Sequence, residues 1–174
     1  MRKSIMLIAA MCMTSVMTLA QDIIRVSTDK TDLVMKVSPK GRLYQVYLGD
    51  KFLNPADYNN LKWDVYAASD GSVCQRGHEV YATSGAEDFF EPAVAVTHAD
   101  GNMTTYLYYQ SSEQKAVKGG TETIITLKDK VYPLTVKLHY VAYAKENVIK
   151  AWSEISHKEK APITLWRYSS TMLY

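Results

Sequence analysis

Apolar and polar residues alternate along most of the chain, and this period of two is typical of half-buried β-strands. Leu33, Met35 and Val37 fall on one face, the turn sequence SPKG follows, and residues 43–48 return as a partner strand. The pattern therefore predicts a first β-hairpin.

Two more hairpins are predicted further along the chain. Residues 93–97 and 103–109 flank the sequence HADGN, whose Asp-Gly pair supplies the positive φ angles that a tight turn requires. Residues 123–127 and 134–140 flank a turn that contains KDK, and the second of these strands has apolar residues at alternate positions. Together the hairpins predict an all-β fold.

The segment NVIKAWSEI, near residue 150, fits two periods. Val148, Trp152 and Ile155 fit one face of a helix, whereas every second residue from Ile149 to Ile155 fits one face of a strand. The surrounding β pattern favours a strand. KEKAP then predicts a turn and residues 163–174 predict a last strand. Because natural domains seldom leave an apolar edge unpaired, we expect the sheet to be completed beyond Tyr174.

The first twenty residues have the order of a secretory signal peptide: Arg2 and Lys3, an apolar run over residues 5–13, and small residues before Gln21. A membrane helix is the alternative, but the run is shorter than the roughly 20 residues that cross a bilayer. We therefore expect residues 1–20 to be removed. The mature chain, residues 21–174, is expected to be one exported β-sandwich domain, periplasmic or extracellular, with no membrane partner.

Charge and cysteine content exclude several classes of protein. Of the 20 Lys and Arg residues, two lie in the leader, and the remaining 18 balance 18 Asp and Glu. No basic stripe for nucleic acid is present. Cys74 alone lies outside the leader, so no intrachain disulfide can form. We expect no nucleic-acid partner.

Chemical motifs are also missing. The histidines have no metal-ligand spacing, and no G-x-S-x-G or phosphate-binding glycine loop occurs. We expect no metal and no cofactor, and we interpret the histidines as structural: His78, His98, His139 and His157.

Two groups of residues have alternative readings. Glu87, Asp88 and Glu91 form the densest carboxylate group, but a retaining glycosidase needs two carboxyls about 5 Å apart on opposite sides of a bond, which nearness in sequence does not supply. The alternative is solvated loop charges, with Asp88 capping a turn.

The 13 Tyr and 3 Trp residues suit either sheet packing or stacking on sugars.

The motif around Asp88 resembles a known family. Asp88, Phe89, Pro92 and Ala93 match a D-F-R-x-P-A motif, with Phe90 where many members have Arg. This region, the hairpin GRLYQVYLGD and the stretch LHYVAYAKENVIKAWSEISHKEKAPITLWRYSSTMLY occur in the order found in the N-terminal domain of glycoside hydrolase family 36 α-galactosidases. The mature chain resembles that domain over most of its length.

This resemblance implies a β-supersandwich of two packed, mainly antiparallel sheets. In a full-length enzyme it is followed by a (β/α)₈ barrel with an Asp nucleophile and an Asp general acid/base, which hydrolyses terminal α-galactosides with retention. Neither catalytic Asp has a counterpart before Tyr174, so we expect no catalytic residue in this chain. The implied partners are its own C-terminal barrel, α-galactoside oligosaccharides and other copies in a homo-oligomer.

The resemblance also implies one substrate contact. By position, Asp64, with Trp63 beside it, matches an Asp that some members carry into the sugar pocket of the barrel, often of a neighbouring subunit. The alternative is a strand-end Asp and a packed Trp. A different class of function is a free-standing, secreted carbohydrate-binding or adhesion module.

Overall fold

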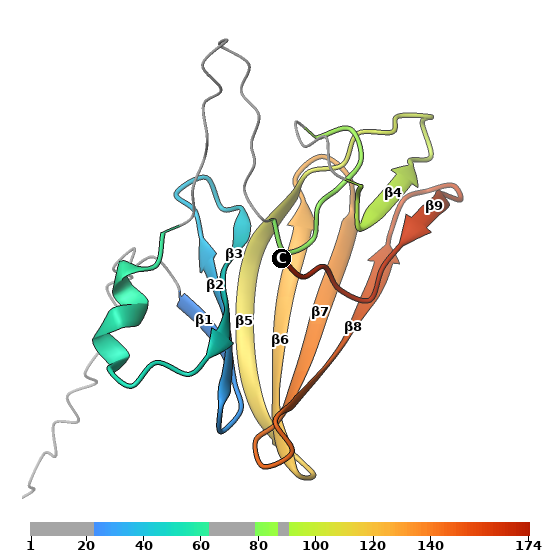
Figure 1. The fold of residues 1–174 in the computed structure, drawn as a ribbon. Helices are drawn as coiled ribbons and strands as arrows, with labels where there is room; N and C mark the ends of the chain where they lie inside the picture. Colours follow the sequence, from blue (N-terminus) through green and yellow to red (C-terminus); the bar gives the residue numbers. More distant parts are fainter. Residues whose placement is uncertain (1–22, 63–78, 87–90) are drawn as a thin grey trace, which may run out of the picture.

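The structure is a computed structural model that describes residues 23–62, 79–86 and 91–174. These residues form nine strands and one short 3₁₀ helix, η1 (Pro55–Asn60) (Figure 1). Within the described ranges, no helix has the length and apolar content to cross a membrane. The strands are β1 (Ile23–Ser27), β2 (Thr31–Val37), β3 (Leu43–Asp50), β4 (Val94–Thr97), β5 (Leu107–Val117), β6 (Gly120–Asp129), β7 (Leu134–Tyr143), β8 (Val148–His157) and β9 (Thr164–Tyr168).

The strands form a sandwich of two layers. One layer is a four-stranded antiparallel sheet in the order β5-β6-β7-β8. The other consists of the sheet β1-β2-β3 and the β4–β9 ribbon, which residues 79–84 connect through the bridges Tyr44 to Glu79 and Thr83 to Val94. Within this layer the three-stranded sheet lies near β5 and the ribbon lies near β8, at opposite ends of the four-stranded sheet (Figure 1). The predicted all-β sandwich is confirmed.

The core lies between these layers. Apolar side chains that alternate along β6 and β7 meet those of β1, β2, β4 and of Val80 and Tyr81, and burial of this apolar area drives the layers together. The largest fully buried members include Tyr81, Tyr140, Leu33, Met35 and Leu138.

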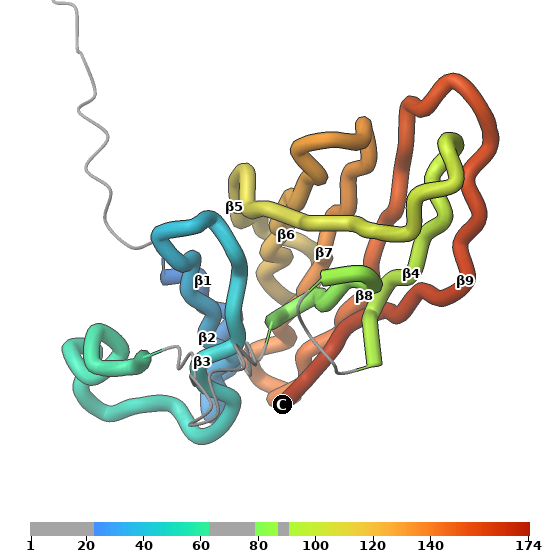
Figure 2. The backbone as a smooth tube through the Cα atoms, turned by 90° about the horizontal axis from the view of Figure 1, so that it is seen from above, coloured from blue at the N-terminus to red at the C-terminus, as the bar shows by residue number. Residues whose placement is uncertain are grey.

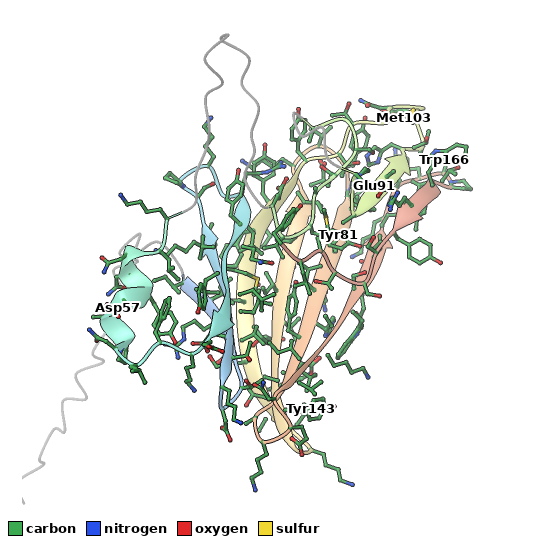
Figure 3. The ribbon with its side chains drawn as sticks, in the orientation of Figure 1. Asp57, Tyr81, Glu91, Met103, Tyr143 and Trp166 are labelled. Carbon is green, nitrogen blue, oxygen red and sulfur yellow. The ribbon has the colours of Figure 1, made fainter. Side chains whose placement is uncertain are left out.

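Residues after β9 close over the open side of the core. The Tyr81 hydroxyl, deep in the sandwich (Figure 3), donates to the carbonyl of Ser169 at 2.7 Å, and the Tyr140 hydroxyl lies 3.3 Å from Thr171 Oγ1. At the end of the chain, Gln45 Nε2 donates to the Tyr174 carbonyl at 2.5 Å. The chain therefore returns from β9 to β3, as Figure 2 shows.

Two predicted hairpins and the disputed strand are confirmed. β2 pairs with β3, and β6 pairs with β7, both antiparallel. The NVIKAWSEI segment lies in β8, which pairs with β7 along its whole length. The last strand is shorter than predicted, because residues 169–174 leave β9 and bond to side chains of the core instead. β1 was not predicted.

The second predicted hairpin is wrong in its pairing. The HADGN turn forms, with the His98 N–H on the Asn102 carbonyl at 2.8 Å and Gly101 at φ 87°. However, β4 pairs with β9, and β5 pairs with β6. The chain after the turn is drawn away from β4 because the Thr105 N–H donates to the Ser84 carbonyl at 3.2 Å.

Candidate functional site

The predicted acidic group is described only at Glu91, because Glu87 and Asp88 lie outside the described residues. The Glu91 carboxylate pairs with the Arg167 guanidinium of β9, and both side chains are well exposed. An exposed carboxylate in a surface ion pair is a solvated charge of small energetic weight. Glu91 therefore fits the non-catalytic alternative.

Trp63 and Asp64, the predicted substrate contacts, also lie outside the described residues. Their proposed role stays a prediction. The structure does describe the residues on either side of this stretch, residues 51–62 and 79–86, and both segments contact the three-stranded sheet.

The N-terminal flank packs on the outward face of the three-stranded sheet (Figure 1). Tyr58 of η1 is buried, and its hydroxyl donates to the carboxylate of Asp32 in β2. The Arg25 guanidinium lies 4.2 Å from the centroid of the Tyr58 ring. Burial, followed by the hydrogen bond to Asp32, raises the pKa of Tyr58. The aromatic ring thus fixes η1 to the sheet.

A buried lysine holds the end of the same flank. The Lys36 side chain of β2 shares the outward face with Asp32, and its ammonium donates to the carbonyls of Asn59, at 3.3 Å, and Leu61. Burial lowers the pKa of Lys36. Because an unpaired buried amine is costly, these two carbonyls are strong anchors, and they lie just before Trp63.

The C-terminal flank begins with a buried ion pair. Glu79 and Arg42 lie 2.7 Å apart, with about a tenth or less of each side chain exposed. The following N–H, of Val80, donates to the Leu43 carbonyl at 3.0 Å. Both flanks of the stretch that contains Trp63 and Asp64 are therefore attached to the three-stranded sheet through buried charged groups.

A second polar constellation joins the HADGN turn to the loop after β8. The His98 ring lies 2.8 Å from Glu159 Oε1 through Nδ1 and 2.9 Å from Thr105 Oγ1 through Nε2. Glu159 Oε2 also accepts the Ala99 N–H at 2.8 Å, and the Tyr132 ring stacks on His98 at 3.5 Å between centroids. We call His98, Thr105 and Glu159 the His98 clasp.

The His98 clasp has the connectivity of an acid, a base and a hydroxyl nucleophile, but it cannot act as one. Thr105 is 0% exposed, so no substrate can reach its hydroxyl. Burial opposes ionisation of Glu159, yet the hydrogen bonds from Ala99 and His98 outweigh it and lower the pKa of Glu159. The clasp therefore stabilises the fold. This arrangement is consistent with the structural interpretation of His98.

A third constellation occupies the outer face of the four-stranded sheet. His139 Nδ1 lies 2.7 Å from Glu122, whose carboxylate also pairs with Lys115 at 3.0 Å. The hydrogen bonds from His139 and Lys115 lower the pKa of Glu122. Trp152 stacks on the His139 ring at 4.7 Å, and the Lys150 ammonium lies 5.2 Å from the Trp152 centroid. Since the ring of Trp152 already has these neighbours, it does not offer a free face to a sugar.

Metal chemistry has no candidate site in the part of the chain that the structure describes. There, no group of three or more His, Cys, Asp or Glu residues is placed to hold a metal ion.

The aromatic residues divide between core and surface. Tyr44, Tyr81 and Tyr140 are buried, whereas Trp166 and Tyr168 of β9 are 68% and 71% exposed. A bulge in the β4–β9 ladder falls at Trp166, whose indole N–H donates to Thr97 at 2.7 Å. Figure 3 shows Trp166 at the outer end of the ribbon. Core packing thus explains the buried tyrosines, and Trp166 and Tyr168 of β9 are among the exposed aromatic side chains.

The comparisons place this architecture among known domains. The family model described as the glycosyl hydrolase family 36 N-terminal domain matches residues 41–174. No curated protein matches the chain.

Several solved structures share the fold. The α-galactosidase from Lactobacillus brevis is 19% identical with a TM-score of 0.73, over 88% of this chain and 24% of that chain. The family 36 α-galactosidases AgaA and AgaB from Geobacillus stearothermophilus are 23% and 21% identical, with TM-scores of 0.74 and 0.70, over 86% and 88% of this chain. The chain spans about a quarter of the length of each of these three proteins.

Proposed function

Because the chain belongs to the glycosyl hydrolase family 36 N-terminal domains, we propose that it is the non-catalytic β-sandwich domain of an exported α-galactosidase. The match over residues 41–174 carries this proposal. The similarity in fold to three α-galactosidases, each about four times as long, supports a parent protein with further domains.

The chemistry of the parent protein is hydrolysis of terminal α-galactosides with retention. Retention needs two carboxyls about 5 Å apart, one as nucleophile and one as acid and base. We assign both to a barrel domain outside these 174 residues. Variants of AgaA have been solved with raffinose and with stachyose, and oligosaccharides of this kind are the substrates that we propose for the parent.

Asp64 and Trp63 contribute to substrate binding in this proposal. Asp64 accepts a hydrogen bond from a sugar hydroxyl in the barrel of the same or a neighbouring subunit, without touching the bond that is broken. The buried anchors at Lys36 and Glu79 support this role, because they hold both flanks of the stretch on the rigid three-stranded sheet. Positioning of this kind keeps a binding group in place at low entropic cost.

β9 supplies the surface on which the rest of the parent packs. Leu165, Trp166 and Tyr168 are exposed, on a strand that has β4 as its one partner in the described sheets. Contiguous exposed apolar side chains mark contact surfaces. In the parent protein, acrylamide quenching of the Trp166 fluorescence, taken as the difference from Trp166→Phe, should be weak. Strong quenching in the parent would contradict packing at β9.

Export follows from the leader. Removal of residues 1–20 delivers the parent to the periplasm or the exterior, where extracellular oligosaccharides are met. Mass spectrometry of the mature N-terminus tests this step, with Gln21 as the expected first residue.

A second candidate is a free-standing carbohydrate-binding module, which the exposed Trp166 and Tyr168 favour, since aromatic faces stack on sugars. The two functions separate by an assay with an aryl α-galactoside. A parent protein that contains this domain and turns over the glycoside supports the first function. Galactoside binding without turnover, by a full-length protein that carries no further domain, supports the second.

A further inference from the structure

A cleft of about 640 Å³ opens between β1 and the four-stranded sheet. All five residues of β1 line one wall. The other wall and the floor come from Ser112, Glu113 and Gln114 of β5, Thr121 and Thr123 of β6, and Ala142 of β7. This volume lies in the range of about 300–1,000 Å³ that small-molecule sites occupy.

The cleft exists because the inner face of the four-stranded sheet changes character along its length. Near one end the inward positions carry Leu107, Leu127 and Val136, which fill the core. Near the other end Ile125 and Tyr140 still fill the core, but the inward positions beside them carry small or polar side chains: Ser112, Gln114, Ala116, Thr121, Thr123 and Ala142. These side chains leave space against β1, and the space is lined with hydroxyl and amide groups.

The wall formed by β1 adds main-chain hydrogen-bonding groups. β1 is an edge strand of its sheet, and the Arg25 carbonyl points away from β2, since it accepts a hydrogen bond from Gln114 Nε2 at 2.9 Å. Alternation gives Ile23 and Ser27 the same orientation as Arg25. The cleft therefore offers main-chain donors and acceptors on one side and side-chain hydroxyls on the other.

The lining selects a neutral ligand. Arg25 lines the cleft, but its guanidinium lies over the Tyr58 ring, 4.2 Å from the centroid. Glu113 follows the outward alternation of β5, opposite in direction to Ser112 and Gln114. The groups directed inward are thus uncharged donors and acceptors, which match the hydroxyls of a sugar.

We propose that this cleft of the β-sandwich binds a short neutral oligosaccharide. Gln114, which also donates to Thr123 Oγ1 at 3.1 Å, is the central polar group. Both Nε2 hydrogens of Gln114 are used by Arg25 and Thr123, and its Oε1 can accept a hydrogen bond from a hydroxyl of a sugar ring. The choice of galactosides as probes rests on the proposed function, whereas the cleft itself does not.

The test uses two neighbouring serines of β5. Ser112 lines the cleft and Ser111 does not, and both are exposed. Saturation-transfer NMR and calorimetry with raffinose are applied to the full chain, to Ser112→Trp and to Ser111→Trp. We expect saturable binding that Ser112→Trp abolishes and Ser111→Trp retains. Loss of the neutral Gln114 hydrogen bonds in Gln114→Leu should weaken binding about two- to tenfold.

Controls keep the result decisive. Ser112 Oγ lies 3.1 Å from the Tyr109 hydroxyl, so Thr121→Trp provides a second way to fill the cleft if Ser112→Trp unfolds the chain. Absence of saturable raffinose binding, or equal binding by both tryptophan variants, would overturn the proposal. Binding of an end-blocked pentapeptide of Thr and Val in place of the sugar would also overturn the proposal. In that case β1 would be an edge to which an extended peptide adds as a further strand. Turnover by the parent protein is measured separately, so the two proposals can fail independently.

Discussion

Replacing Thr105 with valine tests the His98 clasp directly. Valine has nearly the shape of threonine, so Thr105→Val leaves no cavity at a position that is 0% exposed. The change removes one group, the hydroxyl that lies 2.9 Å from His98 Nε2. The backbone bond from Thr105 to Ser84 is untouched.

The magnitude follows from burial. The His98 side chain is 0% exposed, so water cannot replace the lost partner of Nε2. Leaving a buried polar group unsatisfied costs about 1–3 kcal/mol. For a domain of this size, each kcal/mol corresponds to roughly 2–4 °C in Tm. We expect the free energy of unfolding to fall by about 2 kcal/mol and the Tm by about 4–8 °C.

Urea unfolding followed by tryptophan fluorescence measures this change. The slope with urea should match that of the wild type, because the surface exposed on unfolding is the same. Thr126→Val, a half-buried threonine on β6 outside the clasp, is the control and should change stability little. A Thr105→Val variant as stable as the control would refute the claim that the clasp holds the HADGN turn.

Three further predictions follow from the described contacts and the proposed function. Glu159 has a lowered pKa, so its contribution to stability is present above the ordinary value of 4.5 and is lost as the pH falls through the folded value. Glu159→Gln should therefore flatten the dependence of stability on pH below 4.5, and an unchanged pH profile would contradict this. Lys36→Met removes the ammonium that donates to the carbonyls of Asn59 and Leu61, so hydrogen exchange of the backbone amides should become faster in residues 55–61 but not in β7. Equal acceleration in both segments would show that Lys36 is no local anchor. In the parent enzyme, Asp64→Ala should lower kcat/KM about ten- to a hundredfold, because a charge-assisted hydrogen bond of about 1.5–3 kcal/mol is lost. Glu91→Ala should change kcat/KM little. Wild-type kinetics from Asp64→Ala would show that this domain does not contact the substrate.

Local pairing was predictable from the sequence, because a hairpin brings neighbouring residues together. β2 with β3 and β6 with β7 are joined by short turns, and alternation specified their inward faces. The β4–β9 pair joins residues about 70 positions apart. Contacts across this pair, such as the bond from the Trp166 indole N–H to Thr97, join distant segments and have no local signature in the sequence.

The buried polar groups were the other feature that alternation did not predict. Asp32 and Lys36 lie at outward positions of β2, which a period of two assigns to solvent, yet the 51–62 segment covers them. His98 and Glu159 are some 60 residues apart, so their contact is visible only in three dimensions. The family was recognisable from the order of its motifs around Asp88, and the match to residues 41–174 confirms it.

The central claim is that this domain supports catalysis without performing it. Hydrolysis of raffinose, followed by anomer-resolved proton NMR, tests the claim most directly when the isolated chain and the parent protein are compared at equal concentration. We predict that the parent releases galactose first as the α-anomer, whereas the chain of residues 21–174 releases none. Galactose release by the isolated chain, or no release by the parent, would contradict the account.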